Sequence, residues 1–172
     1  MQNEENIPFR SNQREPLRLP AWALTDLLKG VMEKGKPFRF QATGFSMSPF
    51  IKNGDLVTLS TLNRSAPCLG DVVVFTPPES DKLIIHRVVG KRGSSFYIKG
   101  DSLSEIDLLL PQERIVAKVT RVDRNGKGIH LGLGPERRLI ALLSRLGVLV
   151  PIVLSLWKIS FHLGKRTRPG NK

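Results

Sequence analysis

Cysteine is nearly absent from this sequence, because Cys68 is the only thiol in 172 residues. A single thiol excludes an internal disulfide and a zinc site built from several cysteines. The neighbouring residues, Ser-Ala-Pro before Cys68 and Leu-Gly after it, are typical of a turn, so we interpret this residue as a loop or packing thiol. We expect neither a metal nor a cofactor.

An apolar stretch is missing from the first twenty residues, which are polar and charged. This end of the sequence therefore lacks the pattern of a secretory signal peptide. Low-complexity runs and repeats of fixed period are also missing, which argues against a repeat architecture. With 40% hydrophobic and 24% charged residues, the chain has the composition of one folded domain with terminal segments.

Acidic residues are scarce relative to basic ones. Fifteen Asp and Glu stand against 27 Lys and Arg, which gives a formal net charge of +12. This charge predicts attraction to a polyanion, either anionic lipid headgroups or nucleic acid. Charge alone does not distinguish between these two partners.

The hydrophobic pattern divides the chain into four parts. Residues 1–19 are a polar arm that we expect to be mobile. Residues 20–36 contain apolar residues at helical spacing, which predicts a short amphipathic helix. Residues 37–133 alternate with a period of two between turn signals, which predicts a mainly β, compact antiparallel sheet or partly open barrel. We expect strands at Phe38–Ala42, Leu56–Ser60, Val72–Phe75, Leu83–Val89, Ser95–Lys99, Ile115–Val122 and Gly128–Leu131.

The fourth part, residues 134–172, carries an apolar run from Leu139 to Trp157 and a basic tail. Its length permits one membrane span, but Arg145 and Pro151 favour an interfacial or re-entrant helix pair bent at the proline. A hydrophobic helix packed on the β domain is the third possibility. The basic tail suits anionic headgroups, so we expect membrane association through this segment, with the side of the membrane left open.

Two residues in the β region are candidates for chemistry. Ser46 follows a predicted strand in a bend between Gly44 and Pro49, where a hydroxyl can face a substrate beside free backbone N–H groups. Serine is a poor nucleophile until a base takes its proton. Of the three histidines, His86 alone lies between β-branched pairs on a predicted strand, which would hold its ring rigidly.

The motifs around these residues resemble type I signal peptidases, in the same order along the chain, from about Phe38 to Val122. They are Gly44-Phe45-Ser46-Met47-Ser48-Pro49 with Asn53-Gly54-Asp55, Gly70-Asp71-Val72-Val73-Val74-Phe75, His86-Arg87-Val88-Val89 and Lys99-Gly100-Asp101. Four motifs in register make this resemblance specific.

The resemblance implies that Ser46 is the nucleophile and that His86 is the general base. A histidine before Arg-Val-Val is similar to the archaeal and endoplasmic-reticulum branch, whereas common bacterial members have lysine there. That branch orients its histidine with an acid, and the candidates are Asp107, as the direct partner, and Asp101, as a structural acid. Gly44 departs from members that place a serine there as an oxyanion donor.

The same resemblance implies a serine endopeptidase that cuts an extended precursor peptide after small residues at the membrane, in a LexA-like and signal-peptidase-like β fold. The usual N-terminal anchor of the family is not seen in this sequence, and the apolar segment is at the opposite end. A LexA-like self-cleaving regulator is one alternative, although that group uses a lysine base. A catalytically inactive, membrane-tethered β module is the other alternative, and we expect no nucleic-acid partner.

Overall fold

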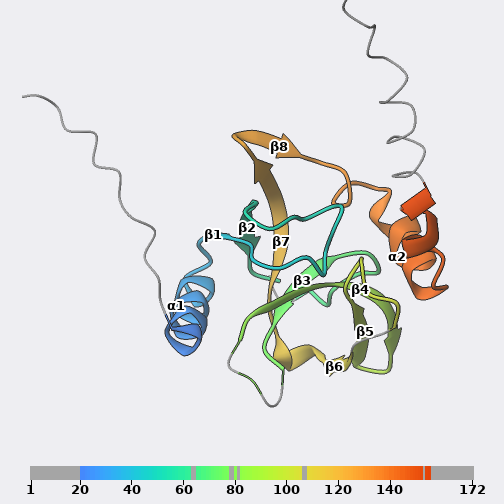
Figure 1. Ribbon diagram of the computed structural model, residues 1–172. Coiled ribbons are helices and arrows are strands. Elements are labelled where there is room, and N and C mark those ends of the chain that lie inside the picture. The colour runs from blue at the N-terminus through green and yellow to red at the C-terminus, as the bar shows by residue number, and fades with distance from the viewer. Residues whose placement is uncertain are drawn as a thin grey trace, which may run out of the picture.

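An antiparallel β-sheet forms the body of the protein (Figure 1). The computed structural model describes residues 20–62, 65–77, 80, 82–105, 108–152 and 154–155. Its helices and strands are α1 (Ala21–Glu33), β1 (Phe38–Gln41), β2 (Leu56–Ser60), β3 (Val72–Phe75), β4 (Ile84–Arg92), β5 (Ser95–Lys99), β6 (Leu108–Pro111), η1 (Gln112–Arg114), β7 (Ile115–Arg124), β8 (Lys127–Ile129) and α2 (Arg137–Arg145).

The strands are ordered β1-β2-β7-β3-β4-β5-β6, and β8 pairs with β7 outside this path. Each pairing is antiparallel, and within the described residues the sheet is not closed, so β1 and β6 are its edges. The expected mainly β, antiparallel domain with a short N-terminal helix is therefore confirmed. The predicted strands β2, β3 and β5 agree residue for residue with the structure.

Strand β6 was not predicted from the sequence. Its residues, Leu-Leu-Leu-Pro, show no alternation and end in a proline, which cannot donate to a sheet ladder. The strand forms because it pairs with β5, from Ile98 opposite Leu108 to Ser95 opposite Pro111. Hydrogen bonding to β5 thus stabilises a strand that the local sequence pattern does not predict.

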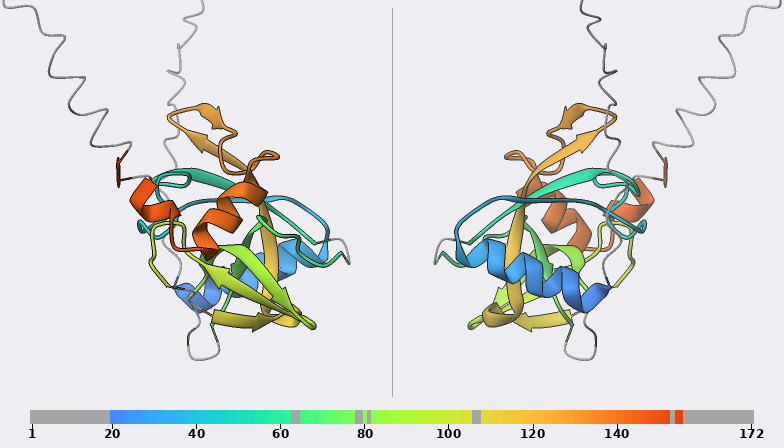
Figure 2. Two further views of the ribbon diagram at one scale, coloured as in Figure 1. Left: turned by 90° about the vertical axis from the view of Figure 1, so that its right-hand side faces the viewer. Right: turned by 90° about the vertical axis from the view of Figure 1, so that its left-hand side faces the viewer.

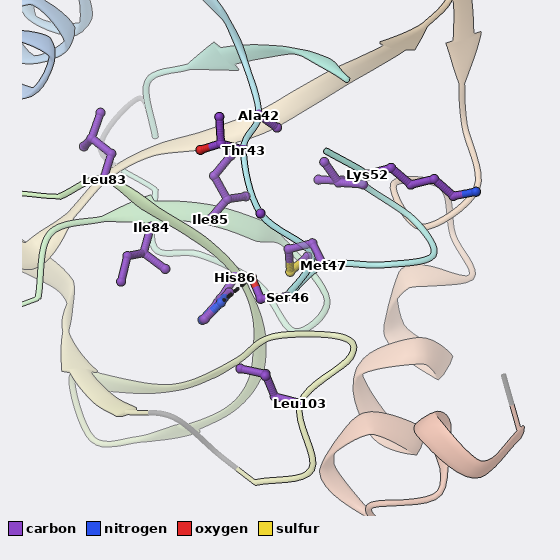
Figure 3. A pocket seen from close by; sticks show the side chains of 12 residues that line it. Ala42, Thr43, Ser46, Met47, Lys52, Leu83, Ile84, Ile85, His86 and Leu103 are labelled. Carbon is purple, nitrogen blue, oxygen red and sulfur yellow. Dashed lines mark hydrogen bonds between the residues drawn. The ribbon is translucent and has the colours of Figure 1, made fainter. Parts of the chain in front are cut away.

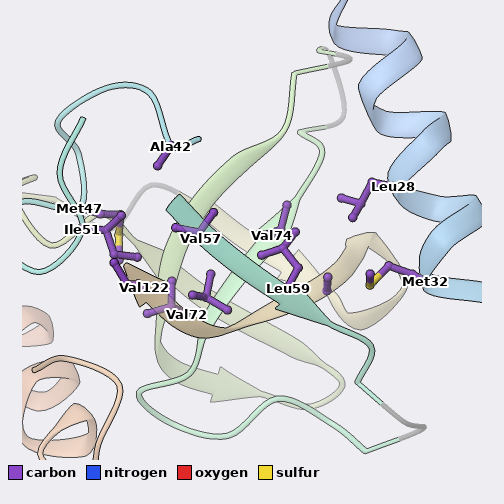
Figure 4. Close-up of a cluster of buried hydrophobic side chains, with 12 residues drawn as sticks. Leu28, Met32, Ala42, Met47, Ile51, Val57, Leu59, Val72, Val74 and Val122 are labelled. Atoms are coloured by element: carbon purple, nitrogen blue, oxygen red, sulfur yellow. The ribbon is translucent and has the colours of Figure 1, made fainter. Parts of the chain in front are cut away.

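The larger hydrophobic cluster joins α1 to the sheet (Figure 4). Val57 and Leu59 alternate with more exposed residues along β2 and are fully buried. Leu28 and Met32 lie one helical turn apart in α1 and bury their side chains in the same cluster. A second cluster, around Val73, Phe75, Val88, Phe96, Ile98, Leu110 and Ile115, fills the other part of the β domain.

The C-terminal segment differs from the single apolar helix or the helix pair bent at Pro151 that we expected. Helix α2 ends at Arg145, and Gly147 adopts φ 74°, a left-handed conformation that ends helices and that glycine tolerates best. Residues 149–152 are helical again, so the interruption lies at Gly147. Figures 1 and 2 show α1 and α2 on different sides of the β domain.

Across the described part of the chain, helices lack the combined length and apolar character that a bilayer crossing requires. Residues 1–19, which we expected to be an arm, and the basic tail in 156–172 lie outside the described residues.

Truncation of a fully buried leucine should weaken the fold measurably. We expect Leu59→Ala to lower the free energy of unfolding by about 3 kcal/mol, because it removes buried methyl groups and leaves a cavity. Leu109→Ala, at a leucine that is 41% exposed on edge strand β6, should cost less than about 1 kcal/mol. Urea denaturation measures both values, and equal losses would contradict this assignment of the core.

Candidate active site

Ser46 lies in a loop whose ends are tied together. The Ala42 N–H donates to Asp55 O, and the Gly54 N–H donates to Ala42 O, each at 2.8 Å. Within the loop, the Gly44 N–H donates to the Asn53 side-chain oxygen at 3.1 Å, and Gly44 itself has φ 93°. These hydrogen bonds give a structural reason for Gly44, Asn53, Gly54 and Asp55 in the Ser46 motif, because each of them helps to fix the shape of the loop.

A buried carboxylate anchors the far end of this loop. Asp55 accepts hydrogen bonds from Arg124 at 2.8 and 2.7 Å and from the Lys52 N–H at 2.8 Å. The Arg124 guanidinium holds the pKa of the Asp55 carboxyl below its usual value. The loop is therefore attached to β7, which occupies the middle of the sheet.

The Ser46 hydroxyl meets the imidazole of His86. Ser46 Oγ and His86 Nε2 are 3.0 Å apart, although the two residues are separated by forty positions in sequence (Figure 3). His86 lies on β4 opposite Val73 of β3, is 6% exposed, and places its ring 6.0 Å from the ring of Phe75. Strand pairing and burial thus fix the position of the imidazole ring beside the Ser46 hydroxyl.

Arg87, the next residue on β4, is paired with Asp101. Its guanidinium donates to both carboxylate oxygens, at 2.8 and 2.7 Å, and both side chains are fully buried. It also donates to the carbonyls of Gly70 and Gly132 at 2.9 and 2.8 Å. Burial raises the pKa of the Asp101 carboxyl, and the hydrogen bonds from Arg87 oppose that shift.

The sequence suggested two acids near His86, Asp101 and Asp107, and the structure describes only Asp101. Asp101 is engaged by the guanidinium of Arg87, as a structural acid would be. Asp107, the expected direct partner of His86, lies outside the described residues.

The turn after β5 holds the Ser46 backbone from behind. The Ser102 N–H donates to Ser46 O at 2.9 Å, and its hydroxyl donates to Phe45 O at 2.8 Å. A Cβ atom on Gly100 would lie 2.8 Å from Ser46 O, so only glycine permits this approach. The role of Ser102 was not predicted, because hydrogen bonds to backbone carbonyls leave no pattern of residues in the sequence.

A groove of about 270 Å³ runs past Ser46 and His86 (Figure 3). Its walls come from the end of β1 with the Ser46 loop and from the beginning of β4. The lining residues are Ala42, Thr43, Gly44, Ser46, Met47, Ile51, Lys52, Leu83, Ile84, Ile85, His86 and Leu103.

Both walls offer strand edges. In the described structure β1 pairs with β2 alone, and residues 84–86 of β4 pair with β3, while the pairing of β4 with β5 begins at Arg87. An extended peptide in the groove would therefore lie between two strand edges whose backbone groups are not paired with another described strand.

Two lysines near the motifs are directed elsewhere. Lys99 is buried and its ammonium donates to Ser144 O. Lys52 lines the groove, but Figure 3 shows its side chain extending away from Ser46.

Among the residues described, no three His, Cys, Asp or Glu side chains gather as a metal site would need.

The buried Arg87–Asp101 pair should be costly to break from one side. We expect Asp101→Asn to lower the free energy of unfolding by about 3 to 5 kcal/mol, because it leaves the guanidinium buried without its counter-charge. The double variant Arg87→Met with Asp101→Leu should recover part of that loss, since neither charge remains. Chemical denaturation measures both, and a double variant less stable than Asp101→Asn would contradict this account.

No curated protein matches this chain. The family model described as "Signal peptidase, peptidase S26" matches residues 31–128, which is more than half of the chain and includes Ser46, His86 and Asp101. The matched region also contains the groove and the strands that form it, so this chain belongs to the signal peptidase family, peptidase S26.

Proposed function

We propose that this protein is a serine endopeptidase that cleaves leader-type peptides, with Ser46 as nucleophile and His86 as general base. Membership in the peptidase S26 family supports serine peptidase activity in signal-peptide processing. The single observation that carries the assignment of residues is the 3.0 Å separation of Ser46 Oγ and His86 Nε2. That distance lies within the reach required for proton transfer between a nucleophile and its base.

The reaction follows from this contact. His86 Nε2 accepts the hydroxyl proton as Ser46 Oγ attacks the carbonyl carbon of the scissile peptide bond. The imidazolium then gives that proton to the leaving amine as the C–N bond breaks, which leaves an acyl-enzyme. A water molecule, deprotonated by the same imidazole, hydrolyses the ester and releases the new carboxyl group.

Backbone N–H groups stabilise the tetrahedral intermediate in this proposal. Gly44 has no side-chain hydroxyl to contribute, and its own N–H is bonded to Asn53. The Ser48 N–H is also engaged, since it donates to Phe45 O at 3.0 Å. The N–H of Ser46 is therefore our candidate oxyanion donor, and a preorganised backbone donor of this kind contributes about 10²-fold or more to turnover.

An acid behind the imidazole completes the site. Asp107 takes this role in our proposal, in which it accepts the Nδ1 proton of His86 and stabilises the imidazolium. Asp101 is a positioning residue, because Arg87 engages its carboxylate and Arg87 adjoins His86 on β4. With a histidine base of this kind, we propose that the chain is of the archaeal and endoplasmic-reticulum type of signal peptidase.

The substrate is an extended segment of a precursor protein. Strand addition to β1 and to residues 84–86 of β4 would present its carbonyl to Ser46 with main-chain hydrogen bonds on both sides. The groove at this point is lined mainly by apolar side chains and is small, which favours cleavage after small residues. The product is a shortened leader and a mature protein.

Removal of the nucleophile should abolish turnover. We expect Ser46→Ala to lower kcat by at least about 10³-fold on a precursor with small residues before the cleavage site. Ser48→Ala is the matched control, two residues further along the same loop, and should retain activity. A fluorophosphonate probe should label the wild type and Ser48→Ala but not Ser46→Ala. Labelling of Ser46→Ala would place the nucleophile elsewhere, and no labelling of the wild type would favour an inactive β module.

The base should impose a pH dependence. An imidazolium accepts no further proton, so kcat/KM should fall when acidification protonates the base. In His86→Gln the amide preserves a polar contact with Ser46 but not the base, so residual activity should be low at every pH. A wild-type profile that does not fall on acidification would contradict an imidazole base.

A further inference from the structure

Helix α2 has two faces of opposite exposure. Ile140, Ala141 and Ser144 are buried against the β domain. The opposite face carries Leu139, Leu142 and Leu146, which are 58%, 49% and 65% exposed. At 100° per residue these three leucines form one stripe, centred about half a turn from the buried stripe.

The inner face of α2 is attached to the Ser46 loop by two contacts. The Lys99 ammonium donates to Ser144 O, and the next residue, Gly100, lies against Ser46 O. Ile140 packs in a small cluster with Phe50, whose N–H donates to Met47 O at 3.1 Å beside the proposed nucleophile. The helix is therefore packed against the elements that hold the Ser46 loop.

The outer face combines apolar and basic groups. Arg138 is exposed on one flank of the leucine stripe, whereas the Arg145 guanidinium turns toward the sheet and lies 5.8 Å from the centre of the Tyr97 ring. Helix α2 itself contains no Asp or Glu. The next described residues extend the apolar surface, with Val148, Ile152 and Leu154 at 39%, 41% and 53% exposure. A leucine stripe with an arginine beside it, on a chain of net charge +12, matches the apolar and anionic layers at the surface of a bilayer.

A second copy of the chain is a poorer match to this face. A stable protein interface needs about 800 Å² from each partner, and three leucines on a nine-residue helix supply only a fraction of that area. The net charge of +12 would also make two copies repel, whereas it attracts an anionic surface.

We propose that the outer face of α2, formed by Leu139, Leu142 and Leu146 with Arg138, binds an anionic lipid surface. Because the inner face is joined to the Ser46 loop, this contact sets the position of the groove relative to the bilayer. The assignment of this lipid-binding surface depends only on the side chains that α2 exposes. Its consequence, preferential cleavage of substrates anchored in the same membrane, rests on the proposed peptidase function.

Vesicle flotation tests the surface. The full chain should float with phosphatidylcholine vesicles that contain about one-third phosphatidylglycerol, and less with phosphatidylcholine alone. The triple variant Leu139→Gln, Leu142→Gln, Leu146→Gln should partition at least about tenfold more weakly. The matched control is Leu27→Gln, Leu69→Gln, Leu109→Gln, which alters three leucines with 41 to 44% exposure on other surfaces and should float as the wild type does.

Two flotation results would overturn the assignment. One is a triple variant that partitions like the wild type, and the other is a control that loses as much partitioning as the triple variant. Light scattering adds a third: a wild type that does not float but forms a dimer, which the triple variant dissociates, would make a second copy the occupant.

Kinetics separate this inference from the proposed function. On a water-soluble peptide the triple variant should keep the kcat/KM of the wild type, and on the same cleavage site anchored in anionic vesicles it should lose about tenfold. Equal kcat/KM of the two proteins on the anchored substrate would refute the positioning role. If the wild type cleaves neither substrate while flotation distinguishes the variants as expected, the peptidase proposal fails and the lipid surface stands.

Discussion

The hydrogen bond between Ser46 and His86 is the interaction on which the functional account depends. Neither side chain is reactive by itself, since the hydroxyl needs a base and the imidazole needs a proton donor in reach. The 3.0 Å contact joins a loop after β1 to the interior of β4. Most of the surrounding structure can be understood as holding these two elements in register.

Three supports converge on this contact. Arg124 and Asp55 attach the Ser46 loop to β7, while Gly100 approaches the Ser46 carbonyl from behind. Arg87 and Asp101, buried next to His86, connect β4 with the turn after β5. The motifs that resemble signal peptidases are thus largely structural, because only a few of their residues face the groove and the others fix the loop, the strand and the turn.

The sequence predicts the sheet and the reactive pair better than their supports. The strands β2 and β5 could be predicted because their alternation and the turns beside them are local patterns in the sequence. Ser46 and His86 could be predicted because the motifs around them resemble those of a known family. Ser102 acts through backbone contacts to residues 57 positions away and carries no local signal. The run from Leu139 onward is apolar on both sides, so its sequence does not reveal that Ile140 packs inward while Leu139 is exposed.

A structure of the protein after reaction with a peptidyl fluorophosphonate tests the central claim most directly. We expect phosphorus bonded to Ser46 Oγ, His86 Nε2 within hydrogen-bond distance of that oxygen, and the peptide extended between β1 and β4. A covalent bond at another residue, or a His86 ring turned away from the adduct, would contradict the proposed roles of Ser46 and His86.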